Sequence, residues 1–356
     1  TFSGDCALLI VLTVDSPVVT KFAQLLSGRV DLIPQAVADR LAFLQSRAPP
    51  MSPQEVEAAL CRCYGEDRSH LFASFDMRPL AVGTVAQVHR AHLASSGEPV
   101  AVKIVKRGMR KGLDRYLFLL RMLSRLGVFG RSKVARLRVE HVTMMFRQQT
   151  DLNLEAASMQ AMQREAQRHR VRREDRCHVP DFPQAYSLFT MENILVMDLI
   201  DDCVSLQDFL AKPSVPVKVM LARVGRIFYR SVMMDGLLHC DMHPGNIMVR
   251  PEFGRIVLLD FGLVGELTES ERVALVAFHL ASVSNEFVFA AEIFVENFVA
   301  DVDGRLSDED VRIRCLVSLG PVFGAHFGEF GGWDFVGFSV DLERVLKEFD
   351  VGVTSA

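Results

Sequence analysis

The spacing of hydrophobic residues changes several times along the chain, and each change predicts a different kind of element. Apolar residues recur every three or four positions over residues 22–37, which is the period of a helix. Ser52-Pro53-Gln54-Glu55 predicts the start of another helix, because Ser can cap it and Glu at the third position completes a capping box. The β-branched run Val100–Val105 instead predicts a strand.

The rest of the chain alternates between short apolar runs, typical of strands, and longer stretches with helical spacing. Short apolar runs predict four strands, at residues 186–189, 194–197, 247–249 and 256–259. Helical patterns occupy residues 108–136 and 139–170, the second as one long helix. A second capping box at 268–271 and a helix start at 307–310 predict a helical C-terminal part, and we expect the Phe-rich stretch 287–298 in its core.

Polar residues beside the last two predicted strands indicate phosphoryl transfer from ATP. Asp241 and Asn246 lie in an expected loop before the first strand, and Asp260-Phe261-Gly262 directly follows the second. The turn signal Pro251-Glu252-Phe253-Gly254 lies between them and predicts a hairpin that brings Asn246 and Asp260 to the same end. Both residues could then hold one Mg²⁺, while Asp241 positions the acceptor hydroxyl. The motif leaves the acceptor open, because small-molecule kinases match it nearly as well as protein kinases do.

A nucleotide-binding region is predicted upstream. Lys103 is the single Lys of its strand, and a Lys in this place pairs the nucleotide phosphates with a helix Glu, for which Glu155 is the candidate. The segment around Gly83 stands where a phosphate loop belongs, although kinase loops are richer in glycine so that backbone amides can approach the phosphates. Its nucleotide-binding candidates are Ala81, Val82, Gly83 and Thr84. Residues 198–202 would form the hinge between lobes, with Met197 guarding the adenine pocket.

Composition and charge narrow the class of protein and its partners. The chain has 356 residues, 49% hydrophobic and 24% charged, which is ordinary for a globular protein of two domains or lobes. A net charge of −4 offers no basic field for nucleic acid. Seven cysteines without a pairing framework suggest free thiols in a reducing compartment. Because the chain begins at Thr1, we expect a fragment or processed product. Its apolar run Cys6–Val14 is too short to cross a membrane, so membrane association would be peripheral or lie outside this sequence.

Taken together, these motifs resemble those of the UbiB (aarF-domain) atypical kinase-like family, from about residue 20 to about residue 300. Lys21-Phe22-Ala23-Gln24 resembles the family's KxGQ signature, and the segment Ala81–His89 resembles its Ala-rich loop. Gln149-Thr150-Asp151 stands where the family has Glu-x-Asp, with Glu155 as the helix Glu. Small-molecule kinases lack these three features, so the combination is specific.

The resemblance implies an α+β fold of the bilobal protein-kinase type. It would comprise a helical N-terminal extension in residues 1–70, a β-rich N-lobe with a long helical insert in residues 71–200, and a helical C-lobe in residues 201–356. By position, Lys21 and Gln24 would gate the active site, with Gln149 and Asp151 as regulatory partners. ATP or ADP and Mg²⁺ would be the cofactors.

The resemblance also implies a cellular role. Family members are regarded as ATPases or small-molecule or lipid kinases that support coenzyme Q or related lipid metabolism. Expected partners are a lipid or quinone precursor, a membrane surface and a biosynthetic complex. The expected location is the mitochondrial inner membrane, with plastid and bacterial cytoplasmic membranes as alternatives.

Two departures from the family pattern leave alternatives open. Ala23 replaces the Gly of KxGQ, and Gln149 replaces an acid and so cannot form a charged pair with a Lys. A hydrogen bond to this neutral acceptor is about half as strong as a charge-assisted one, which would loosen an inhibitory contact. One alternative is a nucleotide-binding pseudokinase that serves as a scaffold for a membrane-associated complex. Another is a soluble small-molecule kinase of the aminoglycoside or choline type.

Overall fold

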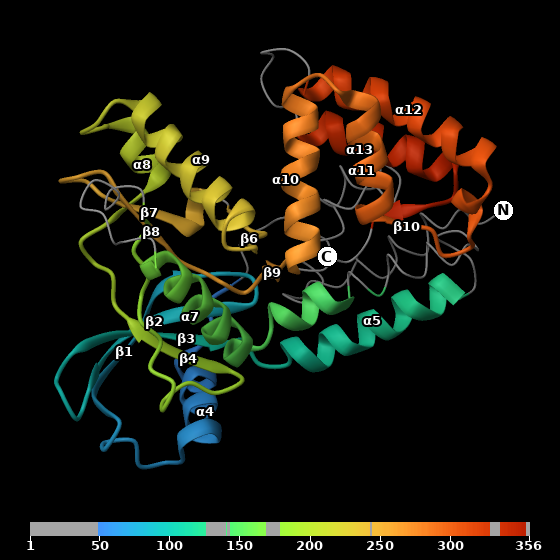
Figure 1. The fold of residues 1–356 in the computed structure, drawn as a ribbon. Coiled ribbons are helices and arrows are strands. Elements are labelled where there is room, and N and C mark those ends of the chain that lie inside the picture. The colour runs from blue at the N-terminus through green and yellow to red at the C-terminus, as the bar shows by residue number, and fades with distance from the viewer. Residues whose placement is uncertain are drawn as a thin grey trace.

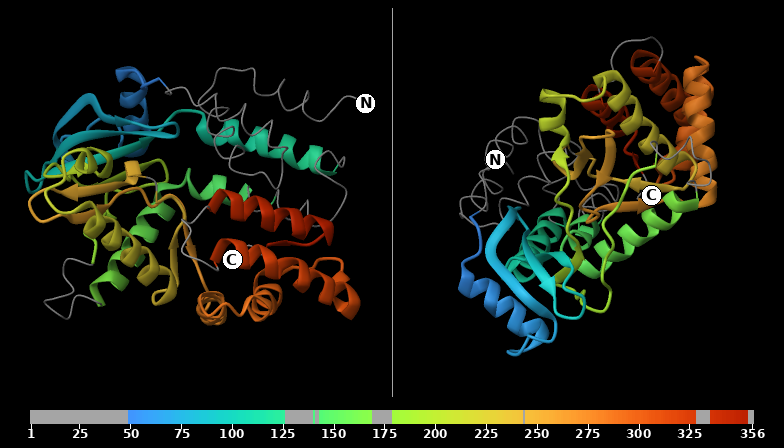
Figure 2. Two further views of the ribbon diagram at one scale, coloured as in Figure 1. Left: turned by 90° about the horizontal axis from the view of Figure 1, so that it is seen from above. Right: turned by 90° about the vertical axis from the view of Figure 1, so that its left-hand side faces the viewer.

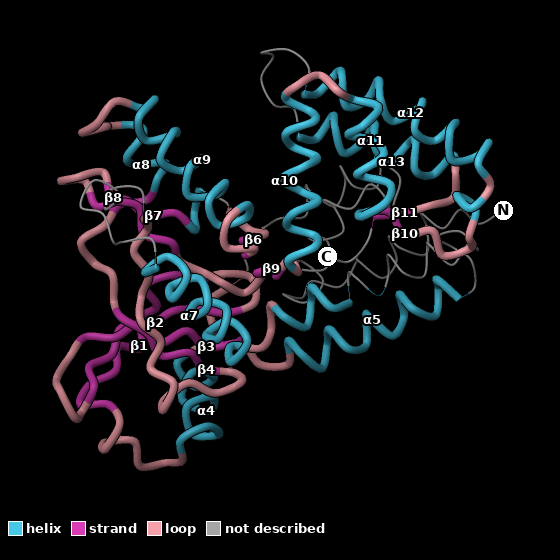
Figure 3. The backbone as a smooth tube through the Cα atoms, in the orientation of Figure 1, coloured by secondary structure: helices cyan, strands magenta, loops and turns pink. Residues whose placement is uncertain are grey.

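The protein folds into a lobe built on a β-sheet and a lobe built mainly of helices (Figure 1). The computed structural model describes residues 49–125, 140, 143–168, 179–242, 244–327 and 335–353. Lys21, Gln24 and the helix predicted around them lie outside these residues. The predicted mixture of a β-rich part and a helical part is confirmed, and Figure 3 shows most strands away from the C-terminal helices, with one small strand pair among those helices.

The first lobe contains a four-stranded antiparallel sheet in the order β1-β2-β3-β4. Its strands are β1 (Phe72–Val82), β2 (Ala86–Leu93), β3 (Pro99–Val105) and β4 (Ile194–Asp198). Three helices accompany the sheet: α4 (Pro53–Tyr64), α5 (Met109–Arg125) and α7 (Leu152–Arg168). The strands predicted at 100–105 and 194–197 and the helix beginning after Ser52 are therefore confirmed.

Strand β3 is buried on both faces, and its alternation decides which residues reach the cavity between the lobes. Successive side chains of a strand point to opposite faces. One face packs against α4 in a core that contains Val100, Val102, Ile104 and Leu60. The other face contributes Ala101 and Val105 to a core that includes Leu152 and Met159 of α7. Lys103 shares the parity of Ala101 and Val105, so its side chain belongs to the α7 face.

The second lobe begins with short strands and two helices. These are β5 (Val204–Ser205), α8 (Leu206–Ala211), α9 (Val217–Met233), β6 (Leu237–His239), β7 (Ile247–Arg250), β8 (Arg255–Leu258) and β9 (Val264–Glu266). Strands β7 and β8 form the predicted antiparallel hairpin, and β6 pairs with β9. The Leu259 amide donates to the Asn246 carbonyl over 2.9 Å, so the end of the hairpin holds Asn246 next to the start of the Asp260-Phe261-Gly262 segment.

The C-terminal helices form a separate apolar core. They are α10 (Glu269–Val283), α11 (Phe287–Phe298), α12 (Glu309–Phe327) and α13 (Phe335–Glu348), with the small pair β10 (Val299–Ala300) and β11 (Gly352–Val353). Phe278, Phe294 and Phe323 contact one another edge-on or tilted within it. The expectation that the Phe-rich stretch 287–298 is core is confirmed for its second part, from Ala290 to Phe298, whereas Val288 and Phe289 are exposed. Both views in Figure 2 place this helical group on the side of the molecule away from α4 and its sheet.

Two predicted elements differ from the structure. The single helix over 139–170 is wrong: helical residues 143–148 end in a turn at 149–150 before α7 begins. Thr150 Oγ1 donates to the Arg147 carbonyl over 3.1 Å, a local bond that competes with helix continuation. The strand predicted at 186–189 is a turn, because the Phe189 and Thr190 amides both donate to the Tyr186 carbonyl over 3.0 Å.

Several local predictions hold. Ser52 with Glu55 and Thr268 with Glu271 form the two expected capping boxes. The five cysteines among the described residues are free thiols. Within the same part of the chain, none of the helices combines the length and apolar character needed to cross a bilayer.

Candidate active site

A cavity of about 640 Å³ lies between the sheet and the β7–β8 hairpin. This volume is in the range of small-molecule and cofactor sites. It is lined by most of the residues singled out from the sequence: Ala81, Val82, Gly83, Thr84, Lys103, Gln149, Glu155, Met197, Asp241, Asn246 and Asp260. Residues as far apart in the sequence as Ala81 and Asp260 therefore meet around one space.

Lys103 and Glu155 form a buried ion pair on the α7 side of the sheet. Lys103 Nζ donates to both carboxylate oxygens of Glu155, over 2.7 and 2.9 Å. Their side chains are only 12% and 2% exposed. Glu155 lies in the first turn of α7, where a negative side chain interacts favourably with the helix dipole. The structure thus brings together the two residues that the sequence proposed as partners.

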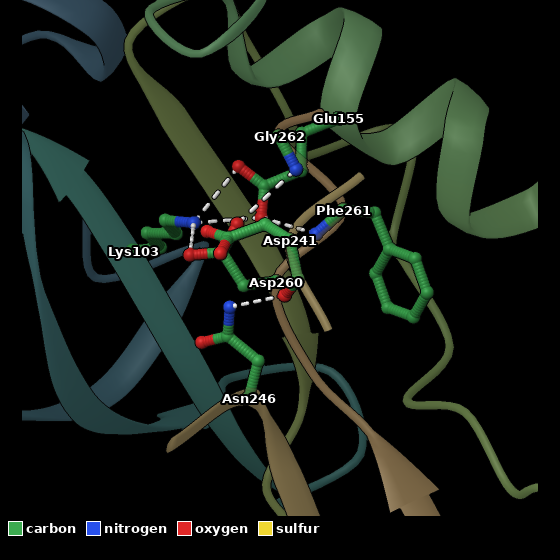
Figure 4. A network of polar contacts seen from close by, with 7 residues as sticks. All are labelled: Lys103, Glu155, Asp241, Asn246, Asp260, Phe261 and Gly262. Atoms are coloured by element: carbon green, nitrogen blue, oxygen red, sulfur yellow. Dashed lines mark hydrogen bonds and ion pairs between the residues drawn. The ribbon is translucent and has the colours of Figure 1, made fainter. Parts of the chain in front are cut away.

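Asp260 completes a charged cluster with this pair. Its Oδ2 lies 3.2 Å from Lys103 Nζ, and its side chain is 43% exposed. Burial by itself lowers the pKa of the Lys103 ammonium, but the carboxylates of Asp260 and Glu155 outweigh burial and raise that pKa above its usual value. Lys103 therefore carries its charge at physiological pH and can attract phosphate groups. Figure 4 shows the three side chains converging, with Asp241 and Asn246 beside them.

The backbone at Asp260 is in the left-handed region, with φ of 56°, which is uncommon for a residue other than glycine. Two contacts stabilise it: the Gly262 amide donates to Asp260 Oδ1 over 3.1 Å, and the Phe261 amide donates to Glu155 Oε1 over 3.3 Å. Phe261 is fully buried in the shared core. A Cβ added to Gly262 would lie 3.2 Å from Asp260 Oδ1, so a side chain there would crowd the carboxylate. The Asp-Phe-Gly sequence therefore sets the direction of Asp260.

The loop from His239 to Asn246 is tied together by its own side chains. Asn246 Nδ2 donates to the Asp241 carbonyl over 3.0 Å, and the Asp241 amide donates to His239 Nδ1 over 3.2 Å. Because Nδ1 accepts a hydrogen bond, the ring is neutral with its proton on Nε2, and burial lowers the pKa of His239 accordingly. This arrangement leaves the Asp241 carboxylate at the cavity wall.

The predicted phosphate loop is a tight hairpin between β1 and β2. The Gly83 amide donates to the Ala86 carbonyl over 2.9 Å, so Thr84 and Val85 form its tip. A Cβ at position 83 would lie 3.2 Å from the same Ala86 oxygen, which explains the single glycine. Residues Ala81 to Thr84 line the cavity, as the sequence suggested.

Gln149 and Asp151, the two regulatory candidates, are placed differently. Gln149 lines the cavity, and no donor among the described residues reaches its buried Oε1. Asp151 lies before α7 rather than on the helix face of Glu155, and its side chain accepts from the Asn153 amide over 3.0 Å. The expectation from spacing, that Asp151 and Glu155 share a helix face, is therefore wrong, because the helix starts between them.

Sequence reasoning missed an ion pair at the cavity. The Arg90 Nη2 atom on β2 lies 3.6 Å from Asp201 Oδ2 in the predicted hinge, and both residues line the cavity. Arg90 has the same parity along β2 as Val88, another lining residue, so strand alternation could have identified it. Of the predicted hinge 198–202, residues 198–201 line this space, as does the buried Met197.

The donor set suits a magnesium ion bound together with phosphates. Mg²⁺ prefers oxygen ligands and is usually held by one or two protein groups plus substrate phosphates and water. Asp260 supplies a carboxylate, and Asn246, whose Nδ2 is engaged with the Asp241 carbonyl, keeps its amide oxygen for a cation. The described residues contain no cluster of three or more His, Cys, Asp or Glu that could hold a metal by itself. The two residues fit the metal if a nucleotide completes the coordination.

Comparisons with known proteins agree with this geometry. A family model described as the ABC1 atypical kinase-like domain matches residues 43–293. The chain is similar to the probable protein kinase UbiB of Azotobacter vinelandii, with 31% identity over 316 residues, 86% of this chain and 57% of that protein. It is also similar to the probable protein kinase UbiB of Aeromonas salmonicida, with 30% identity over 343 residues, 95% of this chain and 61% of that protein. The chain thus spans 57% to 61% of the length of these relatives.

A solved structure shows a similar fold. The complex of Rv3197 with erythromycin from Mycobacterium tuberculosis superposes with a TM-score of 0.54 and 23% identity, covering 81% of this chain and 72% of that chain. At this identity the likeness concerns the fold alone. Together with the family match, it confirms the predicted α+β, kinase-like architecture.

Proposed function

The chain belongs to the ABC1 atypical kinase-like family, and we propose from this that it binds MgATP between its lobes and acts as an ATPase or phosphotransferase. The observation that carries the proposal is the meeting of Lys103, Glu155 and Asp260 at one cavity wall. Lys103 Nζ lies 2.7 Å from Glu155 Oε1 and 3.2 Å from Asp260 Oδ2. Phosphoryl transfer depends on positioned charges, so this cluster is the feature it requires.

Each residue has a role in the proposed reaction. Lys103, held by Glu155, contacts the nucleotide phosphates, and Asn246 and Asp260 hold Mg²⁺, which neutralises charge on those phosphates. Asp241 positions the hydroxyl of the acceptor, or a water molecule in an ATPase. Lys21 and Gln24, which lie outside the described residues, are the proposed gate to the site, with Gln149 and its buried, unpartnered Oε1 at the cavity as a regulatory residue.

The biological setting follows from the relatives' name. Two relatives are named UbiB, and we assign this chain to coenzyme Q or related lipid metabolism, with a lipid or quinone precursor as the candidate acceptor. The proposed location is a membrane surface, that of the mitochondrial inner membrane or of a plastid or bacterial membrane. A multiprotein biosynthetic complex is the proposed partner.

Thermal unfolding with and without MgATP or MgADP tests nucleotide binding directly. Ligand at about a hundred times its dissociation constant stabilises the folded state by roughly 2.7 kcal/mol. We expect this shift in the parent, with a requirement for Mg²⁺, and its loss in Asp260→Ala. Glu252→Ala, at the exposed tip of the β7–β8 hairpin, is the matched control and keeps the shift. Absence of any shift in the parent contradicts the proposed nucleotide site.

Turnover is tested separately, by release of phosphate from ATP with and without candidate acceptors. Asp241→Asn keeps the size of the side chain but removes the carboxylate, so turnover falls while nucleotide binding persists. Unchanged turnover in this variant would refute the role of Asp241. Binding without turnover in the parent would instead favour the pseudokinase scaffold, a function to which the neutral Gln149 and the loop with one glycine also point.

A further inference from the structure

Residues 49–52 form a short segment between the phosphate loop and helix α4, which we call the strap. Pro49 and Pro50 fix their own backbone φ angles and lack amide hydrogens, so Met51 carries its first amide. Ser52 caps α4 through the capping box with Glu55, which joins the strap firmly to the helix. The strap is therefore a stiff connection and not a flexible linker.

Two buried side chains hold the strap, and each flanks the phosphate loop. Gln87, fully buried at the start of β2, accepts from the Met51 amide through Oε1 over 2.8 Å. Lys106, only 6% exposed and just beyond β3, donates from Nζ to the Pro49 carbonyl over 2.8 Å. Neither residue lines the nucleotide cavity.

The same two residues are coupled to the loop through the backbone. The Lys106 amide donates to the carbonyl of Val85, at the loop tip, over 2.9 Å. Gln87 pairs with Val82 across the hairpin that carries the loop. Lys106 therefore holds the loop with its backbone and the strap with its side chain.

The contacts place two polar side chains in buried positions, each with hydrogen-bond partners. Burying an ammonium group needs compensation by hydrogen bonds or charge, and Lys106 obtains it from the Pro49 carbonyl and from nearby Glu55 in the first turn of α4. Gln87 is held on its other side by His89, whose Nε2 lies 2.7 Å from Gln87 Nε2.

We propose that the strap is a coupling element, in which Gln87 and Lys106 transmit closure of the phosphate loop on nucleotide to the start of α4. The proposal rests on nucleotide binding in the cavity and adds a route by which the bound state is sensed outside it. Coupling of this kind is reciprocal, so a change imposed on the strap alters nucleotide affinity by the same factor.

Hydrogen–deuterium exchange of the peptide 51–56, with and without MgADP, tests the coupling. We expect MgADP to slow exchange there by about fivefold in the parent, the lower end of typical coupling between sites. Gln87→Met and Lys106→Met abolish this response and still bind MgADP, with affinity changed by no more than the same factor. Lys212→Met, an exposed lysine after α8, keeps the full response as the control.

The outcomes separate this proposal from the proposed function. If the parent binds MgADP but peptide 51–56 exchanges unchanged, the strap proposal is overturned and the nucleotide site stands. A response that persists in both variants overturns it as well. If the parent binds no nucleotide, the proposed function fails and the strap proposal with it. Should Gln87→Met fail to fold, Lys106→Met decides alone, since it removes a buried charge and keeps the length of the side chain.

Discussion

The two faces of the β1–β4 sheet both bury polar side chains, but they do so in different ways. On the α7 face, Lys103, Glu155 and Asp260 form a charged cluster that borders the cavity. On the α4 face, Gln87 and His89 form a neutral chain of hydrogen bonds away from it. Burying charged groups costs more free energy than burying neutral ones. A charged cluster that borders a cavity therefore marks a candidate ligand site.

The neutral chain on the α4 face is closed at both ends by backbone groups. His89 Nδ1 lies 2.8 Å from the Asp76 carbonyl, which can only accept, so Nδ1 carries the proton. His89 Nε2 then accepts from Gln87 Nε2, and Gln87 Oε1 accepts from the Met51 amide. These three hydrogen bonds connect the chain without any ligand. The comparison predicts that substitutions on the α7 face strongly reduce turnover. Substitutions on the α4 face should reduce stability and leave turnover nearly unchanged.

The largest expected effect comes from Lys103→Met on the charged face. Loss of one group that stabilises transferred charge lowers turnover by roughly 10²–10³-fold. Glu155 would also remain buried without its partner, so the free energy of unfolding falls by about 3 kcal/mol. Phosphate release and denaturant unfolding measure the two effects. Lys212→Met serves as control, and turnover within a few-fold of the parent would contradict the assignment of the charged face.

Gln87→Met tests the neutral face. The substitution leaves the Met51 amide and His89 Nε2 buried without partners, so we expect the free energy of unfolding to fall by about 2 kcal/mol. Turnover at saturating nucleotide stays within a few-fold, because Gln87 does not reach the cavity. Denaturant unfolding followed by circular dichroism gives the first quantity. A large loss of turnover in a folded Gln87→Met variant would contradict the claim that the α4 face affects stability and not catalysis.

The pH dependence of stability sharpens the comparison, because His89 must stay neutral. Burial lowers its pKa, so below about pH 6.5 the unfolded chain binds the proton more readily than the folded protein does. Protonated Nε2 would also face the Gln87 amide as a second donor. Stability from this group is therefore complete above about pH 6.5 and is lost as pH falls, by at most about 1.4 kcal/mol per unit.

Unfolding midpoints between pH 5 and 7.5 measure this effect in the parent and in His89→Asn. The variant should show a shallower loss in acid, with a remaining slope from His239, whose pKa burial also lowers. Identical slopes in the parent and in His89→Asn would mean that His89 is not held neutral.

The difference between the faces also explains what sequence reasoning could find. The charged residues were identified because each lies in a short local pattern, as Lys103 does in its strand and Asp260 after the hairpin. Hydrophobic spacing alone does not show where a helix breaks. The local segment Thr150-Asp151-Leu152-Asn153, however, contains capping chemistry that could have revealed the start of α7. The strap was missed because Met51 and Gln87 are 36 positions apart, and no spacing rule connects them.

The smallest expected effect comes from a pair of matched caps. Ser52→Ala and Thr268→Ala each remove a capping-box hydroxyl that accepts from a backbone amide over 3.3 Å, so each lowers the free energy of unfolding by about 1 kcal/mol. Ser52 ends the strap on the α4 face, whereas Thr268 begins α10 in the separate C-terminal core. Titration with MgADP should therefore distinguish them, with affinity changed by up to about fivefold in Ser52→Ala only. Equal affinities in both variants would show that the α4 face supports the fold without communicating with the nucleotide site.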